Sequence, residues 1–353
     1  MSAVVSGIQQ VGVGVPDVRA AWAWYRRHFG VDIPVFLEED TEAGLMAAYT
    51  GGVAQRRTAL MAINLQGGGG LELWQFTSRP TRPPPARVQL GDYGIFATRI
   101  KSRDVAATYQ RFARSGVSLL SPIVRDPAGS IHFFVEDPHG LVFQIVEGDA
   151  WFTGGPHLTG GVSGCMIGVS DVDRARHLYS DILGYDAVRY DVRGAGADLS
   201  GLPGGQTVVR RVLLERRAPP GGPFGRLLGP SALELVVATG RPSRAIFADR
   251  YWGDLGFMHL CFDITGMTAL KDVCAARGFP FSVDSHQSFA MADATGRFGY
   301  VEDPDGTLVE FVETHRLPLL KRFGWYLDLR AREPTAPLPD WMLKVLRWHR
   351  VSG

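Results

Sequence analysis

The stretch Gln10-Val11-Gly12-Val13-Gly14-Val15-Pro16-Asp17 predicts a strand that ends in a loop at its proline and aspartate. Apolar residues at helical spacing follow it and predict an amphipathic helix that ends at Gly30. The same shape returns 154 residues later as Gly164-Cys165-Met166-Ile167-Gly168-Val169-Ser170-Asp171, with a helix that ends at Gly184. A long internal repeat indicates a structural unit that is used more than once.

Two further copies of this strand and helix lie within residues 95–115 and 259–277. Each is followed by three more predicted strands. The last two strands are joined by Asp137-Pro138-His139-Gly140 in one copy and by Asp303-Pro304-Asp305-Gly306 in the other. Proline at the second position and glycine at the fourth are typical of a type I turn. We therefore predict an α+β fold of four βαβββ modules.

The spacing of shorter motifs predicts how the modules are grouped. Val135-Glu136-Asp137-Pro138 recurs 166 residues later as Val301-Glu302-Asp303-Pro304, and Leu71-Glu72-Leu73 recurs 162 residues later as Leu233-Glu234-Leu235. Modules one and two are therefore expected to form an N-terminal domain, residues 1–150. Modules three and four would form a C-terminal domain, residues 151–314, which begins with a glycine-rich linker. Each domain would be one half-open β-barrel.

Residues 315–353 lie outside the repeat and are predicted to form a C-terminal arm. The arm carries Trp341, Leu343, Leu346 and Trp348, which would be costly to expose to water. We expect the arm to pack on the body of the protein or on a partner subunit. Both a homodimer with exchanged arms and a monomer with an intramolecular clasp fit this pattern.

Composition narrows the class of protein. The chain has 353 residues, 45% of them hydrophobic, and a formal net charge of +1, which is typical of a globular protein with two domains. A near-neutral chain without a basic block argues against nucleic acid as a partner. No apolar run is long enough for a membrane span, and no signal peptide is recognisable. Three cysteines make no disulfide framework, so a cytoplasmic location is expected.

Three polar residues interrupt strands that are otherwise apolar: Glu234, His259 and Glu310. A buried carboxylate is strongly unfavourable unless it is paired or bound to a metal. If modules three and four share one barrel, these side chains converge on its concave face. Two carboxylates and one imidazole would then form an open site for one divalent metal ion, with zinc, manganese, iron, cobalt and nickel all compatible. An ion pair of Glu234 with Arg210 or Arg211 is the alternative.

The βαβββ modules and their Asp-Pro-x-Gly turns resemble the vicinal oxygen chelate superfamily, which includes glyoxalases, methylmalonyl-CoA epimerases, extradiol dioxygenases and bleomycin-resistance proteins. The resemblance covers residues 7–314. It implies ligands from the first and last strands of two paired modules, which in the C-terminal half are Gly164, Glu234, His259 and Glu310. The glycine has no side chain to offer, so three protein ligands remain. The matching positions of the N-terminal half are Gln10, Glu72, Ile95 and Gln144. We interpret that half as degenerate, with Gln10 and Glu72 as a hydrogen-bonded core pair.

The resemblance also implies a reaction. Two glutamates with one histidine are similar to the glyoxalase and epimerase branch, in which the metal polarises a carbonyl and a nearby base removes the α-proton. Glu234, Glu310 and His286 are the candidate bases. The four modules and the tryptophan-rich arm are also similar to cyclitol epimerases that act on 2-epi-5-epi-valiolone. The predicted substrate is therefore a small polyoxygenated molecule such as a cyclitol or a sugar-like ketone.

Two alternatives belong to other functional classes. An extradiol-type dioxygenase with non-haem iron needs a second histidine, which His157 or His286 would have to provide. A resistance protein that binds an antibiotic without catalysis needs only an inert cleft.

Overall fold

The computed structural model describes residues 3–286, 289–291, 294–320 and 325–351. All four βαβββ modules are present. Module one contains β1 (Val4–Gly14), α1 (Val18–Phe29), β2 (Ile33–Glu42), β3 (Arg56–Ile63) and β4 (Gly70–Phe76). Module two contains β5 (Gly94–Ser102), α2 (Val105–Arg114), β6 (Ser118–Leu119), β7 (Val124–Arg125), β8 (Ile131–Glu136) and β9 (Val142–Glu147). Here β6 and β7 both pair with β8, so they act as one interrupted strand.

The second half of the chain repeats this order and adds the arm. Module three contains β10 (Thr159–Gly168), α3 (Val172–Tyr179), β11 (Ala187–Gly194), β12 (Val209–Glu215), a short α4 (Gly225–Leu228) and β13 (Ala232–Ala238). Module four contains β14 (Gly256–Thr265), α5 (Met267–Ala276), β15 (Val283–Asp284), β16 (Phe289–Met291), β17 (Ala294–Glu302) and β18 (Leu308–Leu320). The arm contains β19 (Trp325–Asp328) and α6 (Asp340–Lys344). Among the described residues, no helix is both long and apolar enough to cross a bilayer.

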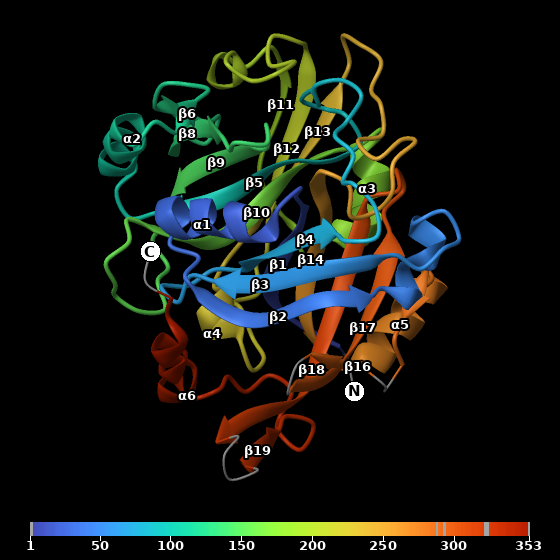
Figure 1. Ribbon diagram of the computed structural model, residues 1–353. Helices are drawn as coiled ribbons and strands as arrows, with labels where there is room; N and C mark the ends of the chain where they lie inside the picture. The colour runs from blue at the N-terminus through green and yellow to red at the C-terminus, as the bar shows by residue number, and fades with distance from the viewer. Residues whose placement is uncertain (1–2, 287–288, 292–293, 321–324, 352–353) are drawn as a thin grey trace.

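The modules pair differently from the expectation. One sheet, here sheet A, runs β15-β17-β18-β14-β1-β4-β3-β2 and joins module four to module one. The other, sheet B, runs β11-β12-β13-β10-β5-β9-β8-β6 and joins module three to module two. Figure 1 shows this as blue strands beside orange ones and teal strands beside yellow-green ones. The predicted pairing of one with two and three with four is therefore wrong, because each half-barrel takes one module from each half of the chain.

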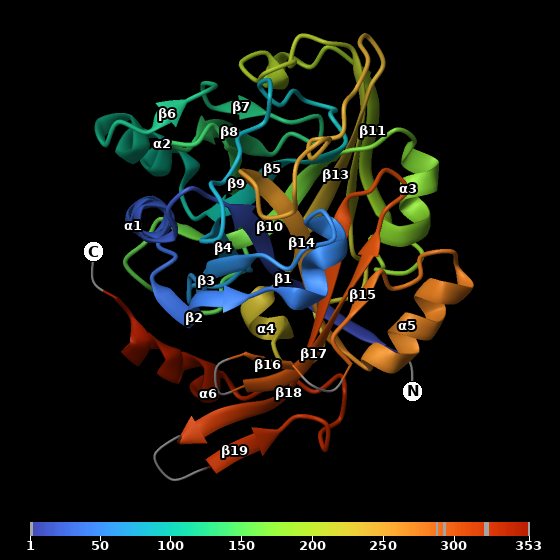
Figure 2. The ribbon, with the colours of Figure 1, turned by 45° about the vertical axis from the view of Figure 1, so that its right-hand side comes forward.

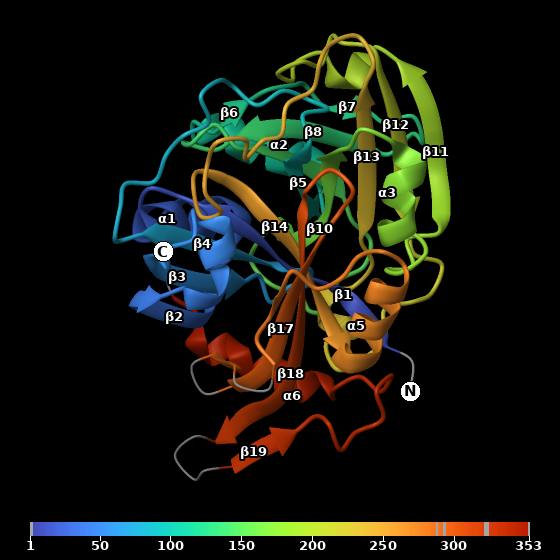
Figure 3. The same cartoon turned by 90° about the vertical axis from the view of Figure 1, so that its right-hand side faces the viewer.

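The two modules within each half of the chain contact each other through their helices, although their strands lie in different sheets. Figures 1 and 3 show α1 with α2 on one side of the molecule and α3 with α5 on the other. Tyr25 of α1 donates a hydrogen bond of 2.6 Å to Asp137 in the turn of module two. Tyr179 of α3 donates one of 2.9 Å to Asp303 in the same turn of module four. In each half of the chain, a hydrogen bond from a helix of one module to a turn of the other therefore links the two modules. Their strands belong to different sheets, and each sheet contains one module from each half.

Local sequence explains where the repeated helices begin. Asp17 accepts a hydrogen bond from the backbone N–H of Ala20, and Asp104 accepts one from Ala107. Asp171 caps α3 in the same way. A carboxylate at this position satisfies a backbone donor that has no partner inside the helix. The first helix ends at Gly30, whose φ of 66° is the left-handed conformation that favours glycine.

The arm packs on its own chain. Leu329, Leu338 and Leu343 are buried in the apolar cluster on the concave face of sheet A, and the red segment in Figure 2 lies beneath that sheet. Two large aromatic residues of the arm are not covered by this chain. Trp341 is 65% exposed and Trp348 is 74% exposed. The leucines, rather than Trp341 and Trp348, hold the described part of the arm in place.

Candidate metal centre

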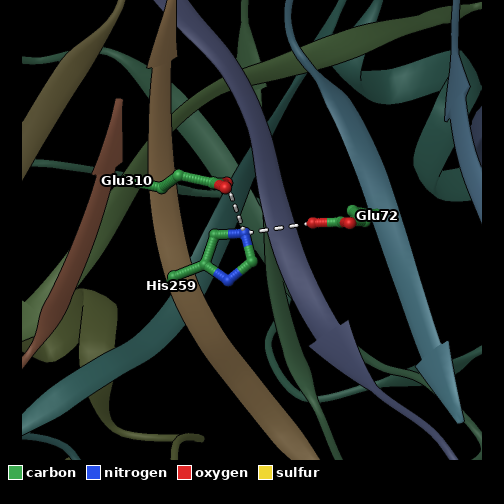
Figure 4. A group of neighbouring side chains, drawn as sticks. All are labelled: Glu72, His259 and Glu310. Carbon is green, nitrogen blue, oxygen red and sulfur yellow. Dashed lines mark ion pairs between the residues drawn. The ribbon is translucent and has the colours of Figure 1, made fainter. Parts of the chain in front are cut away.

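Glu72, His259 and Glu310 meet on the concave face of sheet A. The imidazole Nε2 of His259 lies 3.1 Å from Oε2 of Glu310 and 3.2 Å from Oε2 of Glu72. Figure 4 shows the two carboxylates approaching this nitrogen from two sides. One possible ligand atom from each residue lies within 4.8 Å of the other two. All three side chains are buried, so this is an enclosed cluster of acidic groups around one imidazole.

Strand register explains how distant residues come together. His259 of β14 and Glu72 of β4 lie on either side of β1, and both are level with Gly12. Glu310 lies on β18, the next strand beyond β14. Side chains alternate between the two faces of a sheet, so these residues point to the concave face while Leu71, Leu73 and their neighbours enter the core. The site therefore needs two strands from module four and one from module one.

Gly12 leaves the space that the imidazole occupies. A Cβ atom at this position would lie only 2.2 Å from Cε1 of His259 and 2.7 Å from its Nε2. No side chain fits there while the ring stays in place. Gly12 therefore allows His259 to lie across β1 toward Glu72.

We expect Gly12→Ala to displace the imidazole and to weaken metal binding by about 10- to 100-fold, the usual effect of disturbing the support of a ligand. Metal content after dialysis against a graded chelator series measures this. Gly44→Ala is the matched control, because its Cβ would meet only Glu42 at an ordinary 3.7 Å. Equal metal retention in both variants would contradict this role of Gly12.

Gln10 supplies a fourth polar group to the cluster. Its Nε2 donates hydrogen bonds of 3.0 Å to Glu72 and 3.3 Å to Glu310. Its Oε1 is buried and has no partner. The predicted hydrogen-bonded pair of Gln10 and Glu72 is therefore present, but it belongs to a larger site. Rotation of the amide would turn this oxygen toward the carboxylates as a further ligand atom.

The electrostatics of the cluster favour a positive charge at its centre. Burial alone would lower the pKa of His259, but Glu310 and Glu72 outweigh it and raise the pKa to about 9. Burial raises the pKa of Glu72, because a desolvated carboxylate is less stable when charged. Nδ1 of His259 has no hydrogen-bond partner, and Nε2 faces only the two carboxylates. Two carboxylates, an imidazole and an amide oxygen form a donor set that suits a divalent first-row metal, so the residues fit such an ion.

The structure corrects one predicted ligand and adds another. His259 and Glu310 lie together as predicted, but Glu234 is in sheet B, because modules three and four do not share a sheet. There its Oε1 accepts a 2.6 Å hydrogen bond from Nε of Arg211, which is the alternative that the sequence left open. Glu72, assigned to the degenerate half, takes the place predicted for Glu234. Its signal was a carboxylate inside an apolar strand, the same signal that singled out Glu234.

Among the described residues, sheet B holds no equivalent group of possible metal ligands. Ala97 is level with Val142 as His259 is level with Leu308, so the residue matching His259 is Ala97 and not Ile95. The four matching positions in sheet B are Gly164, Glu234, Ala97 and Gln144. None of these four positions carries an imidazole, and the one carboxylate is paired with an arginine. The buried His132 of β8 lies on a different strand, 3.9 Å from Asp198. The half-barrel without a metal ligand set is therefore sheet B, which spans both halves of the chain.

The other predicted histidines lie away from the cluster. The side chain of His286 is 76% exposed and lies 3.8 Å from Asp284. It occupies a turn with a φ of 51° at the rim of module four. His157 lies 2.8 Å from Asp32. An exposed side chain does not reach the buried cluster, so His286 is not placed to act as the base.

Comparison with known proteins agrees with this architecture. The family model described as the Glyoxalase/Bleomycin resistance protein/Dioxygenase superfamily matches residues 7–145 and 161–311. The chain belongs to this superfamily. A structure described as a putative dioxygenase from Bacillus subtilis is 14% identical, with a TM-score of 0.55, over 88% of this chain and 86% of the other. Glyoxalase I from Zea mays is 14% identical, with a TM-score of 0.52, over 88% and 92%. These likenesses show the fold, and no curated protein matches the sequence.

Proposed function

We propose that the protein is a metal-dependent isomerase or epimerase that moves a proton at a carbon next to a carbonyl group. The observation that carries this proposal is the pair of buried carboxylates, Glu72 and Glu310, on two sides of the single imidazole of His259. Membership in the superfamily supports metal-dependent catalysis in general. The proposed substrate is a small polyoxygenated ketone such as a cyclitol or a sugar-like ketone.

The residues of the cluster would have distinct roles. Gln10, Glu72, His259 and Glu310 would hold the metal, which when bound supplies a positive charge that polarises the carbonyl oxygen. One glutamate accepts the proton as the carbon–hydrogen bond breaks, and the electron pair moves toward the carbonyl. A proton returned to the opposite face of that carbon gives an epimer, and one returned to the neighbouring carbon gives an isomer. The two carboxylates lie close enough together to share this exchange.

The surroundings of the cluster support proton chemistry in an enclosed space. The ring of Trp252, from the segment before β14, is stacked over His259 with centroids 5.9 Å apart. The ring of Tyr300 lies edge-on to the imidazole, with centroids 5.5 Å apart. The ring centroids of Trp74 and Trp252 lie 4.2 Å apart. Apolar walls that exclude water strengthen the interaction between charged groups inside them.

The position of the other histidines weighs against the dioxygenase alternative. Among the described residues, the group able to hold a metal contains one histidine, His259. His157 and His286, which could have completed the iron site, are engaged elsewhere or exposed. An antibiotic-binding protein would have no need for buried carboxylates whose negative charges face each other.

Removal of the metal tests the proposal. We expect protein dialysed against a chelator to lose deuterium exchange at the α-carbon of cyclitol ketones in D₂O, followed by NMR. Addition of one ion among manganese, zinc, iron, cobalt and nickel should restore the exchange. The circular dichroism spectrum should show that the metal-free protein is still folded. Unchanged exchange without metal would overturn the proposal, oxygen consumption with ferrous iron would favour a dioxygenase, and binding without exchange would favour a resistance protein.

A further inference from the structure

We propose that the concave face of sheet B is a second ligand site, which binds a small organic anion with hydroxyl groups. A cavity of about 430 Å³ opens along this face between modules two and three. Its volume lies in the range of small-molecule sites, roughly 300–1,000 Å³. The cavity is separate from the cluster of Gln10, Glu72, His259 and Glu310, none of which lines it.

The cavity is lined by a buried guanidinium group, two of whose nitrogens have no hydrogen-bond partner. Arg99 of β5 lines the cavity and is only 7% exposed. Its Nε and Nη1 atoms are buried and make no hydrogen bond. In the part of the chain that the structure describes, no carboxylate lies within 4.0 Å of it. A buried guanidinium without a directly bonded partner is unfavourable, so an anion in the cavity would stabilise this arrangement.

The nearby carboxylates are already engaged by another arginine. Arg211 binds Glu234 through Nε at 2.6 Å and Asp198 through Nη1 at 2.8 Å. It is 2% exposed, so this is a buried network. Arg99 contributes to the low pKa of Glu234 only through its more distant charge, after burial and Arg211. The network therefore leaves Arg99 available to a ligand.

The equivalent position in sheet A shows how the two half-barrels differ. Arg99 is level with Gln144 in sheet B, as Cys261 is level with Glu310 in sheet A. A thiol beside a carboxylate is thus replaced by a guanidinium beside an amide. The same concave face that collects negative charge for a cation in sheet A presents a positive charge in sheet B. The expected ligand of sheet B is therefore an anion rather than a cation.

The rest of the lining suggests the kind of anion. The basic side chains are Arg99, Lys101, Arg189, Arg216 and Arg217, and the acidic ones are Asp126, Glu147, Asp149 and Glu215. Arg216 also has a buried Nε without a partner. Carboxylates that line a site for an anion can accept hydrogen bonds from hydroxyl groups of the same ligand. A phosphorylated or carboxylated sugar matches this combination, since guanidinium binds either head group through charge-assisted hydrogen bonds.

Calorimetric titration of the full-length, metal-loaded protein tests the inference. The probes are glucose 6-phosphate, gluconate, inorganic phosphate and uncharged glucose. We expect at least one charged sugar to bind, and glucose to bind at least tenfold more weakly or not at all. Comparison of glucose 6-phosphate, gluconate and phosphate shows which head group the site accepts. Absence of binding by all three anions would overturn the inference.

Variants locate the binding. Arg99→Met should weaken binding of the anion at least tenfold without changing the metal content of the protein. Arg19→Met is the control, because it removes an exposed positive charge on α1, outside the cavity. Equal affinity of the Arg99→Met variant and the wild type would refute the site. If circular dichroism shows that Arg99→Met does not fold, Arg216→Met decides, with weaker binding expected and unchanged affinity refuting the site.

Discussion

Glu310→Gln is expected to lower turnover by about a thousandfold, the middle of the range for loss of a general acid–base group. The same variant should lose its metal on dialysis. Glutamine keeps the shape of the side chain but removes the negative charge that faces Nε2 of His259 at 3.1 Å. It also leaves Glu72 as the only carboxylate of the cluster. Metal analysis and the rate of deuterium exchange, measured on the same preparation, check both effects.

Glu234→Gln is the matched control for this experiment. It makes the same chemical change at the corresponding position of module three, in the other sheet. Because Glu234 binds Arg211 and lies outside the cluster, metal content and turnover should stay within about twofold of the wild type. If Glu234→Gln lost the metal and Glu310→Gln kept it, our assignment of the site to sheet A would be wrong.

Arg211→Met should lower the free energy of unfolding by about 3–5 kcal/mol, the usual cost of removing one partner from a buried ion pair. Methionine fills part of the space but leaves Glu234 and Asp198 buried without their shared counter-ion. Denaturant unfolding followed by circular dichroism measures the loss. Arg210→Met is the control, because its partner Asp191 is 42% exposed and the pair should contribute less than about 1 kcal/mol. Equal midpoints for the two variants would contradict this role of Arg211.

The stability lost in the Arg211→Met variant should depend on pH in a definite direction. In the wild type, burial would raise the pKa of Glu234, but Arg211 and Arg99 outweigh it and hold the pKa below its usual value. The wild-type network therefore adds stability above the unfolded pKa of a glutamate and loses it as the pH falls through the lower, folded pKa. In Arg211→Met the pKa of Glu234 should rise, since burial then dominates. The difference in stability between variant and wild type should shrink as the medium becomes more acidic.

The sequence predicted the two site residues of module four correctly, but not the carboxylate that another module supplies. His259 and Glu310 lie 51 residues apart in module four, on parallel neighbouring strands, so their convergence follows from the fold of that module. Glu72 and Glu234 occupy the same position of modules one and three and carry the same signal. Only the choice of the partner module decides which of them faces His259. We predicted the partner module from the order of the modules along the chain, and that prediction was wrong.

The amino-acid sequence by itself determined the four βαβββ modules, the aspartates that cap the helices and the alternation that turns polar side chains to one face of each strand. These features depend on contacts within one module, where a few residues suffice to specify the geometry. Tertiary structure alone decided that module one pairs with module four and module two with module three. Strands pair through backbone hydrogen bonds that are the same in every module. The first strand of any module could therefore pair with the first strand of any other. The packing of both sheets with α1, α2, α3 and α5 around one core makes the choice, and this brings Gln10 and Glu72 to His259 and Glu310.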